Sequence, residues 1–202
     1  AMVTMSMAVF LYFFQDDLKR LLAMSTIANL AYIVLAACLG ILGSTVAYKG
    51  AAIHLANHAC AKGLLFLCVG AFAYSTGMRR ISQLSGLAGK MPVVATCFAV
   101  GILGVVGVPP LANFWSKFYI ITGALSLPGS LGPFVGAFLL VESSVAFAWF
   151  LYIGQRVLLG ETSQAAGEAT DPPWPITASL VVLAVLVAVA PVVAINIAGY
   201  LM

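Results

Sequence analysis

The chain alternates long apolar runs with short polar stretches. A run of about 20 apolar residues is long enough to cross the hydrocarbon core of a membrane as a helix. The pattern predicts about seven helices, of which the first is too short to cross: 1–14, 18–43, 51–74, 91–108, 111–127, 131–159 and 176–202. We therefore expect an all-α, polytopic transmembrane helix bundle, built as a single transmembrane domain over residues 1–202.

One predicted helix is interrupted by a pair of prolines. The apolar run from Met91 to Val108 ends at Pro109 and Pro110, and a second run begins at Leu111. Proline lacks a backbone N–H group and clashes with the preceding turn, so a helix interior does not tolerate two in succession. We expect a discontinuous helix here, at a depth where protein or a wet cavity satisfies the freed backbone groups.

A polar stripe runs through the apolar segment from Ala51 to Phe66, which carries His54, His58 and Lys62. Their four-residue spacing puts all three on one face of a helix, over roughly 12 Å. A second lysine, Lys117, follows the two prolines. Ionisable groups at membrane depth are costly and commonly mark an ion path. The pattern predicts that protons move along these side chains.

The chemistry of the stripe suits proton transfer, although other interpretations remain open. Histidine titrates near pH 6.5, whereas a free lysine, with a pKa of about 10.4, exchanges protons only where its surroundings favour the neutral amine. The two histidines could instead be hydrogen-bonded packing residues. Lys62 could extend to a membrane surface, and Lys117 could belong to a loop.

Three more polar residues are candidates for the same path. Ser25 and Asn29 share one face of the segment 18–43, where they form either interhelical hydrogen bonds or a water-lined path. Glu142 lies in the apolar segment next to that of Lys117, which predicts a switchable pair of opposite charges. Pairing of Glu142 with Arg156 or with a neighbouring subunit is the alternative.

Composition excludes a soluble globular domain. Hydrophobic residues make up 63% of the chain, charged residues only 7%, and the mean hydropathy is +1.11. The net charge of +3 comes without a basic cluster longer than two residues, which argues against nucleic-acid binding. Four cysteines lie singly without metal-ligand spacing, and the chain has no GxGxxG loop, so no cofactor is expected in it.

Basic residues near the predicted helix ends suggest an orientation. If the predicted helices cross alternately, Lys49 and Arg156 lie on one side of the membrane. The opposite side receives Lys19, Arg20, Arg79, Arg80 and Lys90. The positive-inside rule assigns that richer side to the cytoplasm. The acidic, proline-bearing stretch 160–175 is expected to be an exposed linker between the last two helices.

Several blocks of the sequence resemble one family of membrane proteins. They are DLKRLLAMSTIANLAYI (17–33), HLANHACAKGLLFL (54–67), PPLANFWSKFYII (109–121) and the aromatic run AFAWFLYIGQRV (146–157). In combination these blocks resemble the antiporter-like subunits of complex I, of membrane-bound energy-converting hydrogenases and of multisubunit sodium/proton antiporters.

This resemblance implies an architecture and a set of roles. Family members contain two inverted five-helix repeats, each forming half of a proton path, and this chain resembles the second repeat with flanking helices. Another chain or a longer protein would then supply the first repeat. By the same resemblance Lys62 is the central lysine, His54 and His58 are the connecting histidines, and Lys117 is the lysine of the broken helix. Glu142 has no counterpart in the family pattern.

The implied function is proton translocation in the membrane part of a complex-I-related redox complex, such as an NADH-quinone oxidoreductase or a membrane-bound hydrogenase. Other subunits would transfer the electrons. Two alternatives remain: a subunit of a sodium/proton antiporter without a redox partner, and a non-conducting structural subunit. The expected partners are other membrane subunits, lipid, and protons or sodium ions, in the cytoplasmic membrane of a prokaryote.

Overall fold

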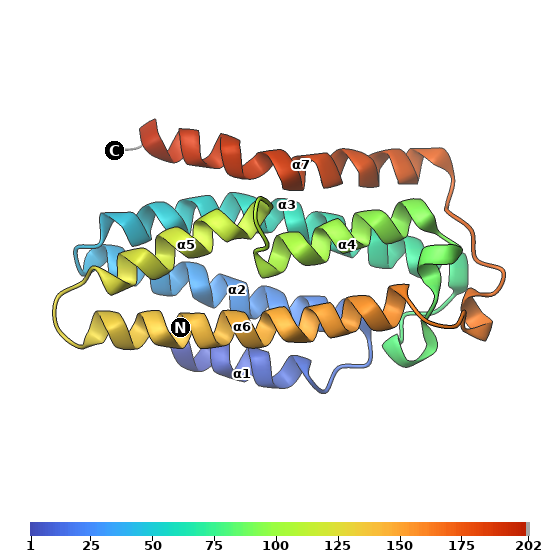
Figure 1. Ribbon diagram of the computed structural model, residues 1–202, viewed down its shortest axis with the longest axis horizontal. Helices are drawn as coiled ribbons and strands as arrows, with labels where there is room; N and C mark the ends of the chain where they lie inside the picture. Colours follow the sequence, from blue (N-terminus) through green and yellow to red (C-terminus); the bar gives the residue numbers. More distant parts are fainter. Residues whose placement is uncertain (201–202) are drawn as a thin grey trace.

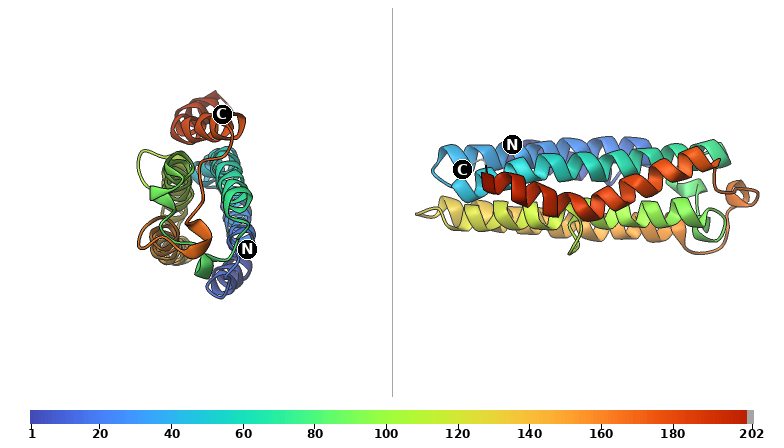
Figure 2. Two further views of the ribbon diagram at one scale, coloured as in Figure 1. Left: turned by 90° about the vertical axis from the view of Figure 1, so that its right-hand side faces the viewer. Right: turned by 90° about the horizontal axis from the view of Figure 1, so that it is seen from above.

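The computed structural model of the protein describes residues 1–200, and it is an elongated bundle of helices that run along one long axis (Figures 1 and 2). The described residues form seven α-helices: α1 (Met2–Tyr12), α2 (Leu18–Ile41), α3 (Thr45–Thr76), α4 (Pro92–Val106), α5 (Ala112–Leu125), α6 (Leu131–Leu158) and α7 (Trp174–Tyr200). The all-α transmembrane bundle predicted from the sequence is confirmed. Of these helices α2, α3, α6 and α7 contain segments long and apolar enough to cross a membrane.

The broken helix is confirmed. α4 ends at Val106 and is followed by Gly107, which has a left-handed conformation with φ of +90°. α5 begins at Ala112, so five residues separate the two helices. Figure 1 shows the two helices end to end, with the connection near the middle of the bundle. The ends of both half-helices therefore lie inside the protein, at the depth of its interior polar residues.

The helix that carries the polar stripe is longer than predicted. α3 begins at Thr45, because the Ser44 side chain caps it by accepting a hydrogen bond from the backbone N–H of Ala47. The prediction that this helix begins at residue 51 is wrong by six residues. Gly50 lies inside this helix, and α5 passes so close to it that a Cβ atom there would lie 2.6 Å from Cγ1 of Ile120. Lys62 consequently lies near the middle of a 32-residue helix.

The break also changes the predicted topology. Because α4 and α5 together cross the bundle once, α6 returns to the end at which α3 finishes (Figure 1). There the carbonyl of Leu159 accepts from the backbone N–H of Gly86, and Ser163 donates to Ser85. The expectation that Arg156 lies opposite Arg79 and Arg80 is wrong, because it treated the two half-helices as separate crossings. Lys49 alone keeps its predicted place at the other end.

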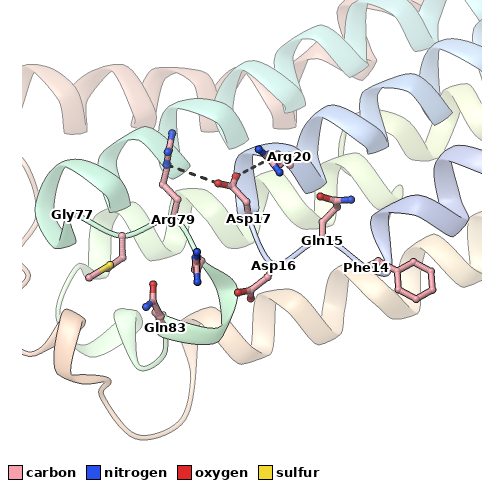
Figure 3. A pocket seen from close by; sticks show the side chains of 10 residues that line it. Phe14, Gln15, Asp16, Asp17, Arg20, Gly77, Arg79 and Gln83 are labelled. Atoms are coloured by element: carbon pink, nitrogen blue, oxygen red, sulfur yellow. Dashed lines mark hydrogen bonds and ion pairs between the residues drawn. The ribbon is translucent and has the colours of Figure 1, made fainter.

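Contacts of backbone and side chains hold together the end of the bundle that carries most charges, where Figure 3 shows the side chains of Asp16, Asp17 and Arg79. The turn before α2 pairs with the loop after α3: Leu18 donates to the carbonyl of Arg79 at 3.0 Å, and the backbone N–H and hydroxyl of Ser82 donate to Asp16. Arg79 and Asp17 form an exposed ion pair at 3.9 Å. A cavity of about 570 Å³ opens between these segments.

The linker between α6 and α7 fastens the first half-helix. It runs over residues 159–173 and includes a short turn of 3₁₀ helix, Gln164–Ala166. Each carboxylate oxygen of Asp171 accepts a backbone hydrogen bond at the N-terminus of α4, from Val93 and from Val94, both at 3.1 Å. These N–H groups have no partner within the helix, and a carboxylate also complements its dipole there. Asp171 thus fixes the outer end of α4.

Candidate functional site

The interior of the bundle contains a concentration of polar side chains around the helix break. Apart from Ser44, which caps α3, the buried polar residues of the described part of the chain belong to α2, α3 and α5. They are Ser25, His54, Asn57, His58, Lys62, Asn113, Ser116 and Lys117, each with 8% or less of its surface exposed. Buried polar groups are costly unless they are hydrogen-bonded, so the partners of each one matter.

Lys62 is held between α2 and α6. Its Nζ donates to the carbonyl oxygen of Leu22 at 3.1 Å and to the hydroxyl of Ser25. The ring of Phe150 lies 5.6 Å from the same nitrogen, within the range of a cation–π contact. No carboxylate of the described residues lies within 4.0 Å of it. The ammonium group is therefore stabilised by dipoles and a ring, not by an opposite charge.

His54 is hydrogen-bonded on both sides of its ring. Nδ1 lies 2.8 Å from the hydroxyl of Ser116, and Nε2 lies 3.1 Å from Oδ1 of Asn29. The amide nitrogen of Asn29 donates to the carbonyl of Ser25 at 2.8 Å, which fixes its orientation. The oxygen of Asn29 faces His54 for that reason, and because this oxygen can only accept, Nε2 must carry a hydrogen.

Three rings form a stack that continues along the stripe. Tyr32 stacks on His54 with centroids 5.4 Å apart, and His54 stacks on His58 at 5.8 Å. His58 is 4% exposed, and neither of its ring nitrogens has a hydrogen-bond partner in the described part of the protein. Both ring nitrogens of His58 are therefore free to form hydrogen bonds at a position between His54 and Lys62.

Lys117 depends directly on the helix break. Its Nζ donates to the carbonyl oxygen of Val106 at 3.2 Å and lies 5.7 Å from the ring of Tyr32. Val106 is the last residue of α4, where carbonyl groups lack intrahelical partners and the helix dipole is negative. By ending α4 inside the bundle, the break supplies a hydrogen-bond acceptor to the buried ammonium of Lys117.

Glu142 and Lys117 line one small cavity together with Ser25, Asn29 and Tyr12. The cavity has a volume of about 10 Å³, which is close to the least that holds one water molecule. The two charged groups do not form an ion pair within 4.0 Å, among the described residues, and Glu142 contacts the hydroxyl of Ser143 at 3.5 Å.

The alternative pairing of Glu142 with Arg156 is not found in the structure. Arg156 instead donates to the hydroxyl of Tyr152 at 3.1 Å, one turn away on α6 and near the end of the bundle.

Hydrogen bonds join several of the predicted residues. The hydroxyl of Ser25 accepts from Lys62 and its carbonyl accepts from Asn29, and the ring of His54 lies between Asn29 and Ser116. His58 joins this group by stacking on His54, and Lys117 lies next to Ser116 in the chain. Glu142 lies beside this group, across the small cavity.

The sequence analysis missed Ser116 and Asn57 as parts of the site. Asn57 is fully buried and donates to the carbonyl of Ala112 at the start of α5. Its position three residues after His54 would have placed it near the stripe. Ser116 directly precedes a buried lysine and lies opposite His54. The carbonyls of Leu22 and Val106 carry no signal in the sequence.

Metal binding finds no support in the described residues. No group of three or more histidine, cysteine or acidic side chains is placed there to hold an ion. The cysteines are separate free thiols: Cys68 and Cys97 are buried, Cys60 is partly buried and Cys38 is exposed. The arrangement contains amines, imidazoles, hydroxyls and one carboxylate, which are groups that take up and release protons.

Comparison with known proteins gives a consistent result. Residues 1–152 match the family described as "NADH:quinone oxidoreductase/Mrp antiporter, TM". The chain is 36% identical over 162 residues to NADH-quinone oxidoreductase subunit N of Desulforudis audaxviator, covering 80% of this chain and 31% of that protein. It is 30% identical over 173 residues to F(420)H(2) dehydrogenase subunit M of Methanosarcina mazei, covering 86% of this chain and 34% of that one.

A solved structure has the same fold. A chain of the membrane-bound sulfane sulfur reductase, an archaeal respiratory membrane complex, superposes with a TM-score of 0.82 at 29% identity. The match covers 95% of this chain and 31% of that one. The present chain therefore spans about a third of the length of these relatives.

Proposed function

Because the chain belongs to the NADH:quinone oxidoreductase/Mrp antiporter family of transmembrane proteins, we propose that it moves protons across a membrane as an antiporter-like subunit of a larger complex. The observation that carries this proposal is the cluster of hydrogen-bonded polar residues around His54 and Lys62, which lies inside an apolar bundle. A protein that only filled space in a complex would gain nothing from the cost of burying two lysines and two histidines.

The proposed path has a titratable group at each end and two between. Lys62 and Lys117 hold the ends, and His58 and His54 pass protons between them, with water bridging the gaps that the side chains leave. Ser25 and Asn29 hold the orientation of Lys62 and His54 through the bonds described above. Glu142 takes part at the Lys117 end: a proton that passes from the ammonium to the carboxylate leaves both groups neutral.

Electron transfer is assigned to other subunits. The relatives named as NADH-quinone oxidoreductase and F(420)H(2) dehydrogenase subunits support a redox complex as the setting. The family description also includes Mrp antiporters, so a sodium/proton antiporter without redox partner is the second candidate. The bacterial and archaeal relatives support the cytoplasmic membrane of a prokaryote as the location.

Other membrane subunits are the proposed partners. The outer faces of α6 and α7 expose large apolar side chains such as Phe134, Val141, Val182 and Val192, which either lipid or neighbouring helices cover in the membrane. The matched relatives are about three times as long as this chain, and we propose that the first inverted repeat comes from the rest of such a protein or from another subunit.

The experiment that tests the proposal replaces Lys62 by methionine, which keeps the length of the side chain and removes the proton-carrying group. Proton uptake is measured in vesicles that contain the whole complex, with its redox activity followed in parallel. Lys90→Met, at an exposed lysine near the end of the bundle, is the matched control. We expect Lys62→Met to abolish most proton uptake and the control to keep it.

Three other results would each change the assignment. Unchanged proton uptake in an assembled Lys62→Met complex would contradict a conducting role and support a structural subunit. Proton movement that requires sodium ions, in a complex that copurifies without oxidoreductase activity, would favour the antiporter. Loss of assembly in Lys62→Met alone would point to a packing role, and Lys62→Arg, which keeps the charge, would then separate packing from charge.

A further inference from the structure

The hydroxyl of Ser116 lies within hydrogen-bond distance of two groups that can each accept its single hydrogen. Its side chain is fully buried, and its oxygen lies 2.8 Å from Nδ1 of His54 and 3.0 Å from the carbonyl oxygen of Asn113. A serine hydroxyl donates one hydrogen bond and accepts up to two. It can therefore donate either to the histidine or to the carbonyl, and the choice depends on what Nδ1 carries.

The hydrogen bond at Nε2 of His54 determines which of the two acceptors Ser116 donates to in each protonation state. Nε2 must keep its hydrogen, since it faces the oxygen of Asn29. In neutral His54, Nδ1 is then a bare acceptor, and the hydroxyl of Ser116 donates to it. In protonated His54, Nδ1–H donates to the oxygen of Ser116, and the hydroxyl hydrogen turns to the carbonyl of Asn113. Both states leave every hydrogen of the imidazole and the hydroxyl paired.

We propose that the Ser116 hydroxyl is a two-position switch. When Nδ1 of His54 is protonated, the oxygen of Ser116 accepts a hydrogen bond from it, and the hydroxyl then donates to the carbonyl of Asn113 in the first turn of α5. The inference rests on the proposed function, in which His54 takes up and releases protons. The proton that binds Nδ1 comes, through water of the proposed path, from protonated His58 or from the ammonium of Lys117, which becomes neutral as the ring gains a charge of +1. The proton then leaves to the other of these two groups, which gains the charge in turn. Ser116 loses no proton, because its O–H bond only rotates.

The consequence lies on the helix that carries Lys117. Asn113 belongs to the first turn of α5, and its carbonyl is the acceptor that the hydroxyl bonds only when His54 is charged. Side-chain bonds of this kind to the preceding turn alter helix geometry slightly. Protonation of His54 is thereby communicated to the turn that precedes Lys117.

Other ionisable groups surround His54 but leave Nδ1 to Ser116. Tyr32 from α2 and His58 from α3 stack on its ring. Lys117 from α5 lies over the far side of this group, at the ring of Tyr32, and shares a cavity with Glu142 from α6. The segment of α7 up to Asn196 contains no ionisable side chain. These charges bias the proton affinity of His54 in the wild type and in Ser116 variants alike, so a comparison between variants isolates the hydroxyl.

The test is nitrogen-15 NMR of histidine-labelled complex in membranes, followed across pH. Signals that disappear in His54→Gln are assigned to His54. In the wild type we expect neutral His54 to carry its hydrogen on Nε2, with Nδ1 as acceptor. Ser116→Ala leaves Nδ1–H without a buried acceptor, so the proton affinity of His54 should fall roughly tenfold. Ser116→Thr keeps the hydroxyl and should stay within about threefold of the wild type.

Two results would overturn the inference. One is a neutral His54 with its hydrogen on Nδ1 in the wild type, a measurement that needs no Ser116 variant and so does not depend on whether one folds. The other is a proton affinity in Ser116→Ala that equals the wild-type value. Failure of the proposed function looks different: proton transport would survive His54→Gln, whereas the NMR measurements on His54 still decide the role of Ser116.

Discussion

Replacing Gly50 by alanine should push α5 away from α3 and break the site without changing any polar residue. A Cβ atom at position 50 would lie 2.6 Å from Cγ1 of Ile120 and 2.9 Å from its backbone nitrogen. Ordinary contact begins at 3.4 Å, so the two helices must separate locally by about 0.8 Å. Overpacking of this kind destabilises a protein by about 1–3 kcal/mol.

The displacement reaches the site because the same two helices carry the next contact. His54 lies one turn after Gly50 on α3, and Ser116 lies one turn before Ile120 on α5. Their hydrogen bond of 2.8 Å would lengthen to about 3.6 Å, which is beyond hydrogen-bond range. We expect thermal unfolding to occur several degrees lower and proton uptake to fall roughly tenfold, since a buried polar group is left unpaired.

The matched controls are Gly63→Ala and Gly70→Ala, on the same helix, where an added Cβ meets nothing within 4 Å. Both should leave uptake unchanged and stabilise α3 slightly, because alanine favours a helix by about 1 kcal/mol over glycine. Native stability and uptake in Gly50→Ala would refute the reasoning. A loss of stability with full uptake would show that α5 yields at Ile120 without moving Ser116.

Three further predictions concern other parts of the structure. Asp171→Ala removes both bonds at the N-terminus of α4 and should lower stability by about 1–2 kcal/mol in thermal unfolding, whereas Glu168→Ala, in the same linker, should not. Arg79→Gln breaks an exposed pair at 3.9 Å and should cost less than about 1 kcal/mol, measured in the same way. Tyr32→Phe keeps the stack on His54 and should retain most proton uptake, whereas Tyr32→Leu should lose it if the ring supports Lys117.

The helices and their membrane character follow from local features that the sequence carries. Asp17 caps α2, because its carboxylate accepts a hydrogen bond from the backbone N–H of Arg20 at 3.0 Å. The proline pair follows the end of α4, where the missing N–H groups prevent the helix from continuing. Both boundaries are set within one turn of the chain. The start of α3 was not predicted, because glycine at position 50 is typical of a turn. The structure explains this glycine by a tertiary contact: α5 approaches too closely to leave room for a side chain.

The candidate site was predictable in its titratable residues and not in its partners. His54, His58, Lys62 and Lys117 stand out because ionisable groups are rare in apolar segments. Their acceptors are mostly backbone carbonyls and hydroxyls, which every segment contains. Which of them meets a lysine depends on how α2, α3 and α5 pack, and no pattern along the chain reports that packing.

The two lysines share a property that bears on how they could release protons. Lys62 is held by the carbonyl of Leu22 and the Ser25 hydroxyl, and Lys117 by the carbonyl of Val106. A buried lysine in an ion pair that gives its proton to any group other than its own carboxylate leaves that carboxylate as an uncompensated negative charge, which is strongly unfavourable. A lysine held by neutral dipoles leaves no such charge. The carbonyl that the break exposes at Val106 therefore binds the ammonium of Lys117 and leaves no charge behind when the amine loses its proton. A variant that restores a continuous helix would occupy this carbonyl, so it should bind Lys117 less strongly.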